Sequence, residues 1–253
     1  MSSAHGFFSL GGVLGATLGS FLMPIFNHPV YHMISISGLV ILVNIVLAKH
    51  YFFISEQQHF KEKTTFSFTK LKPLLTIAFI AVIVMGSEGA IEHWSGLYLL
   101  EIVKITQQNL AGIGFIIFSV MMTIGRFFGD GISHKIGSMK TISLGCLLAI
   151  LGYLCVLASQ FVLTVFGYGI VGLGLSVVIP ELFRMAGNTS GIKASVGISI
   201  VSGIGFLGFL FGPVILGIIS SKYDLKISFL TVLILTCFAL LIAVLKLRKT
   251  ETN

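Results

Sequence analysis

The sequence predicts an all-α membrane protein: a polytopic bundle of about eight transmembrane helices. Hydrophobic residues make up 55% of the 253-residue chain and charged residues only 10%, whereas soluble domains carry about 25% charged residues. The apolar residues gather into eight runs, each near the roughly 20 residues that one helical crossing requires. The net charge of +7 is spread over basic residues between these runs, a pattern typical of loop anchors and not of a nucleic-acid surface.

Short connections with turn-forming residues separate most of the runs. Asn27-His28-Pro29 follows the first run, Ser159-Gln160 the fifth and Lys222-Tyr223-Asp224 the seventh. The one long connection, residues 51–72, is rich in Glu and Lys. The helices are expected near residues 6–23, 31–50, 73–99, 108–130, 139–158, 161–186, 195–219 and 227–246.

The distribution of Lys and Arg predicts the orientation of the helices. Of the 16 basic residues, only Lys104, Lys222 and Lys226 fall in connections on one side of the membrane. Because basic residues collect on the cytoplasmic side, both termini and the long connection are expected in the cytoplasm, with the protein in the inner (plasma) membrane.

The third helix carries the most polar stretch inside any expected span. Glu88 and Glu92 are four residues apart and therefore share one helical face, an arrangement that suits proton binding and release. With Pro73 at the cytoplasmic edge and a rise of about 1.5 Å per residue, Glu88 lies about 22 Å into the membrane. A charged residue at the centre of a span costs about 2.5–3.5 kcal/mol, so Glu88 is expected to face a cavity or a partner.

The residues that follow have two interpretations each. Glu92 and His93 lie close to the outer surface and are either candidates for substrate or proton coupling or ordinary interfacial residues. Trp94 is either an interfacial anchor or part of the same candidate site.

A charged, glycine-rich segment, GRFFGDGISHKIGSMK at residues 125–140, separates the fourth and fifth runs. It predicts a tight loop at the cytoplasmic surface. Arg126 and Asp130 are four apart at the end of the fourth helix, where Gly125 and Gly129 form a close-packing face.

The motifs of enzymes and metal sites are absent from the sequence. It has no phosphate-binding loop, no Gly-x-Ser-x-Gly elbow and no His-Glu-x-x-His helix, and its three cysteines have no metal-ligand spacing. No enzyme activity, metal or organic cofactor is therefore expected. Near the end of the sixth helix, Glu181 and Arg184 are three apart and predict an ion pair on one face.

A pattern of small residues in the first helix recurs in the seventh. Either it marks a repeated unit of six helices, or it is ordinary packing by glycines, which let helices approach closely in lipid. As a repeat, it leaves one complete unit at residues 73–253 and only the last two helices of a unit before it. The matching residues are Ser9, Gly12, Gly15 and Gly19 in the first helix and Ser202, Gly205, Gly208 and Gly212 in the seventh.

Gly125-Arg126-x-x-Gly129-Asp130, followed by Lys135-x-Gly137 and Lys140, resembles the cytoplasmic loop signature between the eighth and ninth helices of the major facilitator superfamily. Three further segments resemble a bacterial branch similar to fucose permease-like sugar transporters. They are His5-Gly6-x-x-Ser9-Leu10-Gly11-Gly12, Glu88-Gly89-Ala90-x-x-x-Trp94-Ser95-x-x-Tyr98-Leu99 and Pro180-x-Leu182-Phe183-x-x-Ala186-Gly187.

This resemblance implies a fold of twelve helices in two halves, with the site between the halves. The eight helices here then correspond to the fifth through twelfth, and the chain is expected to be N-terminally truncated. Residues 1–50 would be the last two helices of the first half, residues 51–72 a cytoplasmic linker and residues 73–253 the complete second bundle.

The resemblance also implies a function: transport of a small solute, such as a sugar or another small polar compound, by alternating access. A proton is the expected coupling ion, with Glu88 as its site. His93 stands where an acid commonly precedes the Trp in this branch, and Glu92 is an added acid. The alternative is a non-transporting truncated or split-gene remnant, and a split protein would pair with a separately encoded N-terminal fragment.

The resemblance and the repeat together predict a latch. In it, Asp130 lies beside Arg126 and near the N-terminus of the first helix, whose unpaired N–H groups carry positive charge.

Overall fold

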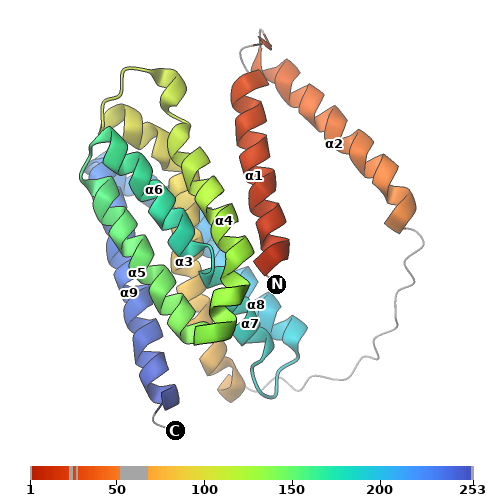
Figure 1. Cartoon of the computed structure of the whole chain (residues 1–253), viewed down its shortest axis with the longest axis vertical. Helices are drawn as coiled ribbons and strands as arrows, with labels where there is room; N and C mark the ends of the chain where they lie inside the picture. The colour runs from red at the N-terminus through yellow and green to blue at the C-terminus, as the bar shows by residue number, and fades with distance from the viewer. Residues whose placement is uncertain (1, 23–24, 27, 52–67, 252–253) are drawn as a thin grey trace. The chain divides into compact units, whose positions relative to one another are not determined.

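A computed structural model describes residues 2–22, 25–26, 28–51 and 68–251 (Figure 1). The described residues are mostly α-helical and include no strand. The chain divides into two compact units, one formed by Met1–Val13 and Phe66–Asn253 and the other by Leu14–Thr65. The expected linker at 51–72 falls largely outside the described residues.

The smaller unit contains the second part of α1 (Ser2–Leu22) and α2 (Pro29–Tyr51). The larger unit contains the start of α1, a 3-10 turn at Gln108–Leu110 and seven further α-helices. These are α3 (Phe68–Glu101), α4 (Ile113–Ile136), α5 (Ser138–Leu157), α6 (Phe161–Leu175), α7 (Val178–Gly187), α8 (Ala194–Lys222) and α9 (Leu225–Glu251).

The length and composition of these helices confirm a multi-pass membrane protein. Seven segments of the described chain are long and apolar enough to cross a bilayer, and α1 contributes a shorter apolar stretch at Ser9–Gly19. The all-α fold class predicted from the sequence is therefore confirmed, with α1 in the place of the first expected span.

The sixth expected span differs from the prediction because it is broken. One apolar segment, Phe161–Gly187, contains two helices, α6 and α7, which are separated at Ser176 and Val177. Pro180 accounts for the break: it has no N–H to donate to the Ser176 carbonyl four residues earlier, and its ring clashes with a carbonyl at that position in a continuous helix.

The expected loop at residues 125–140 is mostly helical. The α4 helix runs to Ile136 and α5 begins at Ser138, so Gly137 alone separates them. Gly137 has φ of +85°, and its N–H donates to the Ser133 carbonyl at 2.9 Å. Because a glycine adopts this conformation without steric cost, one residue is enough to reverse the chain.

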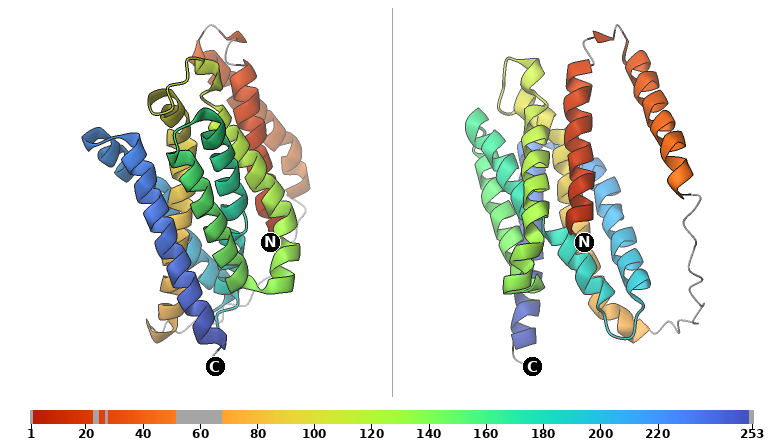
Figure 2. Two further views of the ribbon diagram at one scale, coloured as in Figure 1. Left: turned by 60° about the vertical axis from the view of Figure 1, so that its left-hand side comes forward. Right: turned by 45° about the vertical axis from the view of Figure 1, so that its right-hand side comes forward.

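Two helix pairs make the most extensive contacts of the larger unit. The α3 helix packs along α8, and α5 packs along α6, beside which it lies in Figure 1. The α9 helix lies along α5 (Figure 2). A cluster of buried aromatic rings at Tyr98, Tyr153, Tyr168 and Phe229 joins α3, α5, α6 and α9, with ring centroids 4.8–6.4 Å from Phe229.

Glycines set the distance between α3 and α8. A Cβ atom added at Gly86 would lie 3.2 Å from the Gly208 carbonyl oxygen, and one at Gly212 would lie 3.1 Å from the Gly86 Cα. A Cβ at Gly208 would collide with the Val82 backbone, 2.7 Å from its carbonyl carbon. The two backbones therefore touch directly, as expected where small residues mediate helix association in lipid.

Replacing Gly208 by Ala is expected to destabilise the larger unit, because the added methyl group forces α8 away from Val82. Overpacking of this kind costs about 1–3 kcal/mol. The measurement is the thermal unfolding midpoint of the purified protein in detergent. Gly203→Ala on the same helix is the matched control, since no atom lies within 4 Å of its Cβ position. Equal midpoints for the two variants would contradict the close backbone contact.

Candidate functional site

A cavity of about 600 Å³ lies among α1, α3, α4 and α8 in the larger unit. Its volume falls within the range of about 300–1,000 Å³ that is usual for ligand pockets. Both acidic residues that the sequence singled out on α3 line it. The lining residues are Phe7, Ser9, Gly11, Gly12, Glu88, Glu92, Phe115, Phe118, Ser119, Met122, Arg126 and Phe209.

An ion pair between α3 and α4 forms the polar centre of this cavity. Arg126 Nη2 lies 3.6 Å from Glu88 Oε1, with 4% and 17% of the two side chains exposed. Arg126 Nη1 also donates to the Ser9 hydroxyl on α1. The guanidinium therefore joins three helices at one point.

The structure gives Arg126 a partner on another helix that its spacing in the sequence did not suggest. The sequence predicted Arg126 beside Asp130, which stays a prediction, and the structure brings the guanidinium to Glu88 as well. A signal was present: Arg126 falls within an apolar span, near its end, and an Arg in such a span needs a partner of opposite charge. The side chains of Asp130 and of residues 2–5 lie outside the described part of the structure, so the latch stays a prediction.

Glu92 lies one turn beyond Glu88 and faces the same cavity. Its side chain is exposed, and it forms no ion pair with any residue that the structure describes. The two carboxylates thus differ in environment: Glu88 lies beside a guanidinium, whereas Glu92 has no ion-pair partner among the described side chains.

The next two side chains are held by hydrogen bonds to backbone carbonyls. His93 Nδ1 donates to the Gly89 carbonyl on its own helix at 2.9 Å. Trp94 Nε1 donates to the Pro213 carbonyl on α8 at 3.1 Å, and its ring packs against Gly217. Neither residue lines the cavity. The candidate coupling role of His93 and Trp94 stays a prediction, and both side chains have a structural role here.

Gly89 packs closely against α8 at Pro213. Pro213 has no N–H, so the Phe209 carbonyl four residues earlier has no helical donor. A Cβ atom at Gly89 would lie 3.0 Å from that carbonyl oxygen and 3.2 Å from the Pro213 ring. A glycine beside Glu88 therefore lets α3 approach α8 at its proline.

The predicted ion pair on α7 is present and reaches further than its spacing suggests. Arg184 Nη2 lies 2.7 Å from Glu181 Oε2. The same nitrogen donates to the hydroxyls of Ser133 at 2.6 Å and Ser138 at 2.7 Å, on either side of Gly137. The pair thus ties α7 to the turn between α4 and α5.

The remaining residues of the 125–140 signature occupy distinct environments. Gly125 packs against Ser176 at the break between α6 and α7, where a Cβ atom would lie 2.8 Å from that of Ser176. Gly129 is buried, whereas Lys135 and Lys140 are exposed.

The predicted packing glycines have different surroundings in the two matched helices, α1 and α8. Gly205, like Gly208 and Gly212, packs on α3, where its Cβ position is 3.2 Å from Ala81 Cβ. For Gly12, no described atom lies within 4 Å of that position. The packing role of Gly12, Gly15 and Gly19 stays a prediction.

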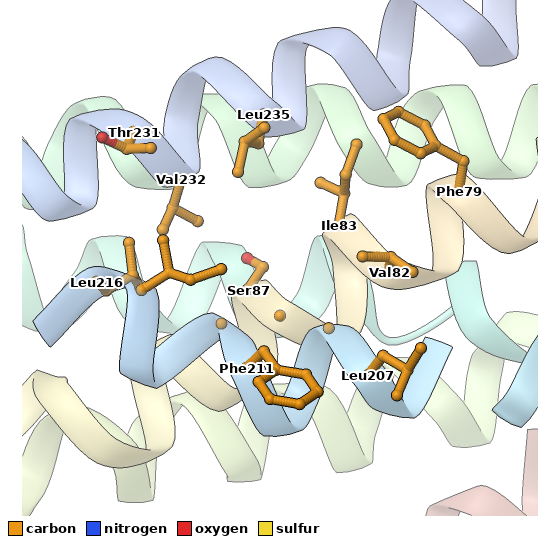
Figure 3. Close-up of a pocket in the computed structure, with 14 residues that line it drawn as sticks. Phe79, Val82, Ile83, Ser87, Leu207, Phe211, Leu216, Thr231, Val232 and Leu235 are labelled. Atoms are coloured by element: carbon orange, nitrogen blue, oxygen red, sulfur yellow. The ribbon is translucent and has the colours of Figure 1, made fainter. Parts of the chain in front are cut away.

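A second cavity, of about 350 Å³, lies among α3, α8 and α9 and is lined almost entirely by apolar side chains (Figure 3). Its two lining hydroxyls are already bonded: that of Ser87 to Tyr153 and that of Thr231 to the Ile227 carbonyl at 3.0 Å. It therefore offers little to a polar solute, and the cavity with Glu88 is the candidate site.

Comparison with known protein families identifies the chain. The sequence profile of the Major Facilitator Superfamily matches residues 1–196. The chain belongs to this superfamily. It is 29% identical over 230 residues to an uncharacterized MFS-type transporter of Yersinia pestis, covering 90% of this chain and 59% of that protein.

Two further proteins are also similar. Membrane protein MosC of Rhizobium meliloti is 32% identical over 153 residues, which is 60% of this chain and 37% of MosC. The uncharacterized transporter y4wD of Sinorhizobium fredii is 28% identical over 250 residues, which is 97% of this chain and 64% of y4wD. The chain thus spans less than two thirds of the length of each of these relatives.

Glu88 and Arg126 are expected to stabilise the protein as a pair. Removing one partner takes away an opposite charge that lies 3.6 Å from the other inside the membrane-spanning unit, and breaking such a pair is more costly than replacing both partners. Arg126→Gln and Glu88→Gln should each lower the unfolding free energy, and the double variant should lose less than the sum, with a coupling energy of about 0.5–3 kcal/mol.

The measurement is the free energy of reversible unfolding in mixed detergent micelles. Lys226→Gln is the control for loss of a positive charge, since Lys226 is exposed on α9. Additive effects of the two single substitutions would argue against a direct interaction.

Proposed function

We propose that this chain takes part in transport of a small solute across the cytoplasmic (inner) membrane by alternating access, coupled to protons through Glu88. The ion pair of Glu88 with Arg126 in the wall of a cavity carries this proposal. A carboxylate inside a membrane span is costly unless it has a partner or a function, and this one lies where a solute could reach it.

The ion pair suggests how a proton would be coupled to solute binding. With Glu88 ionised, Arg126 is attracted to α3; with Glu88 protonated, that attraction is lost and the hydrogen bond to Ser9 on α1 remains. Each protonation state of Glu88 therefore favours a different set of contacts for Arg126. If a solute binds more tightly when Arg126 makes one set of contacts than when it makes the other, solute binding and the protonation of Glu88 are thermodynamically coupled.

The proposed orientation places both termini in the cytoplasm. In that orientation, the turn at Gly137, with exposed Lys135 and Lys140 beside it, faces the side on which basic residues collect.

Proton coupling is tested in proteoliposomes that contain the 253-residue protein and a trapped pH indicator. Addition of the transported member of a panel of sugars and other small solutes should evoke a proton flux. Glu88→Gln should reduce this flux more than tenfold, because Gln cannot release a proton. Solute exchange in the absence of a pH gradient should continue, since Gln at position 88 resembles the protonated form of Glu88. Glu101→Gln is the matched control, since Glu101 is an exposed acid on the same helix outside the cavity.

A proton flux in Glu88→Gln equal to that of the unmodified protein would exclude Glu88 as the coupling site. Protein that folds, as judged by its unfolding midpoint, yet moves no solute of the panel would favour the remnant hypothesis. Transport restored by co-expression with an N-terminal fragment of a longer relative would favour the split protein.

A further inference from the structure

We propose that the cavity with Glu88 accepts a monovalent organic cation that carries an apolar, ring-bearing body. This inference rests on the proposed transport function and names its class of solute. It departs from the sugar that the sequence resemblance suggested, and it comes from the charge and the composition of the cavity walls.

The charge of the cavity favours a cation. Two carboxylates, those of Glu88 and Glu92, face one guanidinium, that of Arg126. Arg126 lies beside Glu88 at 3.6 Å, whereas Glu92 forms no ion pair with any described residue. A solute with one positive charge, bound in the cavity, would lie beside the Glu92 carboxylate and balance its charge.

The rest of the wall favours an apolar body. The rings of Phe115 and Phe118 on α4 lie next to each other, with centroids 6.4 Å apart and an interplanar angle of 29°. Phe7 of α1 and Phe209 of α8 complete the aromatic lining. Aromatic faces attract cations, and quaternary ammonium groups are often recognised in this way.

The same wall has few groups for a sugar. Among the side chains that the structure describes, the lining has two polar groups besides the three charged ones, those of Ser9 and Ser119. The Ser9 hydroxyl already accepts a hydrogen bond from Arg126. A site for a polyhydroxylated solute needs several placed donors and acceptors, because each buried hydroxyl left without a partner weakens binding.

The test measures binding of radiolabelled benzyltrimethylammonium to the purified protein in detergent. Benzylsulfonate, an anion with the same benzyl group, and L-fucose serve as competitors. We expect saturable binding of the cation, no competition by either competitor at tenfold higher concentration, and binding about tenfold weaker in Glu92→Gln. Glu101→Gln should bind as the unmodified protein does, since that acid lies outside the cavity.

Three results would overturn the inference: no saturable binding of the cation, equal competition by benzylsulfonate, or unchanged affinity in Glu92→Gln. Because the Glu92 side chain is exposed, this variant is expected to fold, and its unfolding midpoint checks that it does.

Uptake by proteoliposomes separates this inference from the proposed function. If the protein takes up L-fucose in a Glu88-dependent way but does not bind benzyltrimethylammonium, the inference of a cationic solute is wrong and the proposed transport function is supported. If the protein binds the cation, and binds it more weakly in Glu92→Gln, but takes up no solute, the inferred cation site is supported and the proposed transport function is contradicted.

Discussion

Direct backbone contact between α3 and α8 is the constraint on which the cavity depends. In a bilayer, burial of apolar side chains gives little drive for helices to associate, so close packing between small residues takes that role. Gly86 and Gly89 pack directly against α8: a Cβ atom added to either would lie 3.0–3.2 Å from a backbone carbonyl oxygen of α8. This contact fixes the rotation of α3 about its own axis, and Glu88 and Glu92 consequently face the cavity.

Pro213 lies in α8 at the point where this helix packs against Gly89, next to Glu88. Pro213 leaves the Phe209 carbonyl without a helical donor, and Gly89 of α3 packs against that carbonyl. The next turn of α8 is held from α3 as well, since the Trp94 indole donates to the Pro213 carbonyl. The turn of α8 around Pro213 is thus covered by α3. In lipid, a backbone group that lacks its helical partner needs such cover by protein.

Hydropathy predicted the spans because lipid imposes their length and composition on the sequence. The i,i+4 spacing of Glu88 and Glu92 likewise predicted a shared face, and both residues line one cavity. The break at Ser176 was missed because apolar composition is the same in a continuous and in a broken span. Pro180 was visible, yet its effect depends on whether the surrounding helices accept a break.

The pairing of Glu88 with Arg126 could not be predicted from spacing. The residues are on different helices, and Asp130 offered Arg126 a closer partner in the sequence. Only the packing of α3, α4 and α1 places the guanidinium beside Glu88 and Ser9. The same limit applies to Arg184, whose bonds to Ser133 and Ser138 cross from α7 to the turn between α4 and α5.

These two arginines give the 125–140 segment a structural meaning beyond that of a surface loop. One end of the segment supplies Arg126 to the cavity, and the other end is a turn held by Arg184. Between them α4 is continuous to Ile136, and a helix of ten residues is about 15 Å long and nearly rigid along its axis. A displacement of α4 at the turn would therefore move Arg126 relative to Glu88, so the ion pair and the turn are mechanically connected through a single helix.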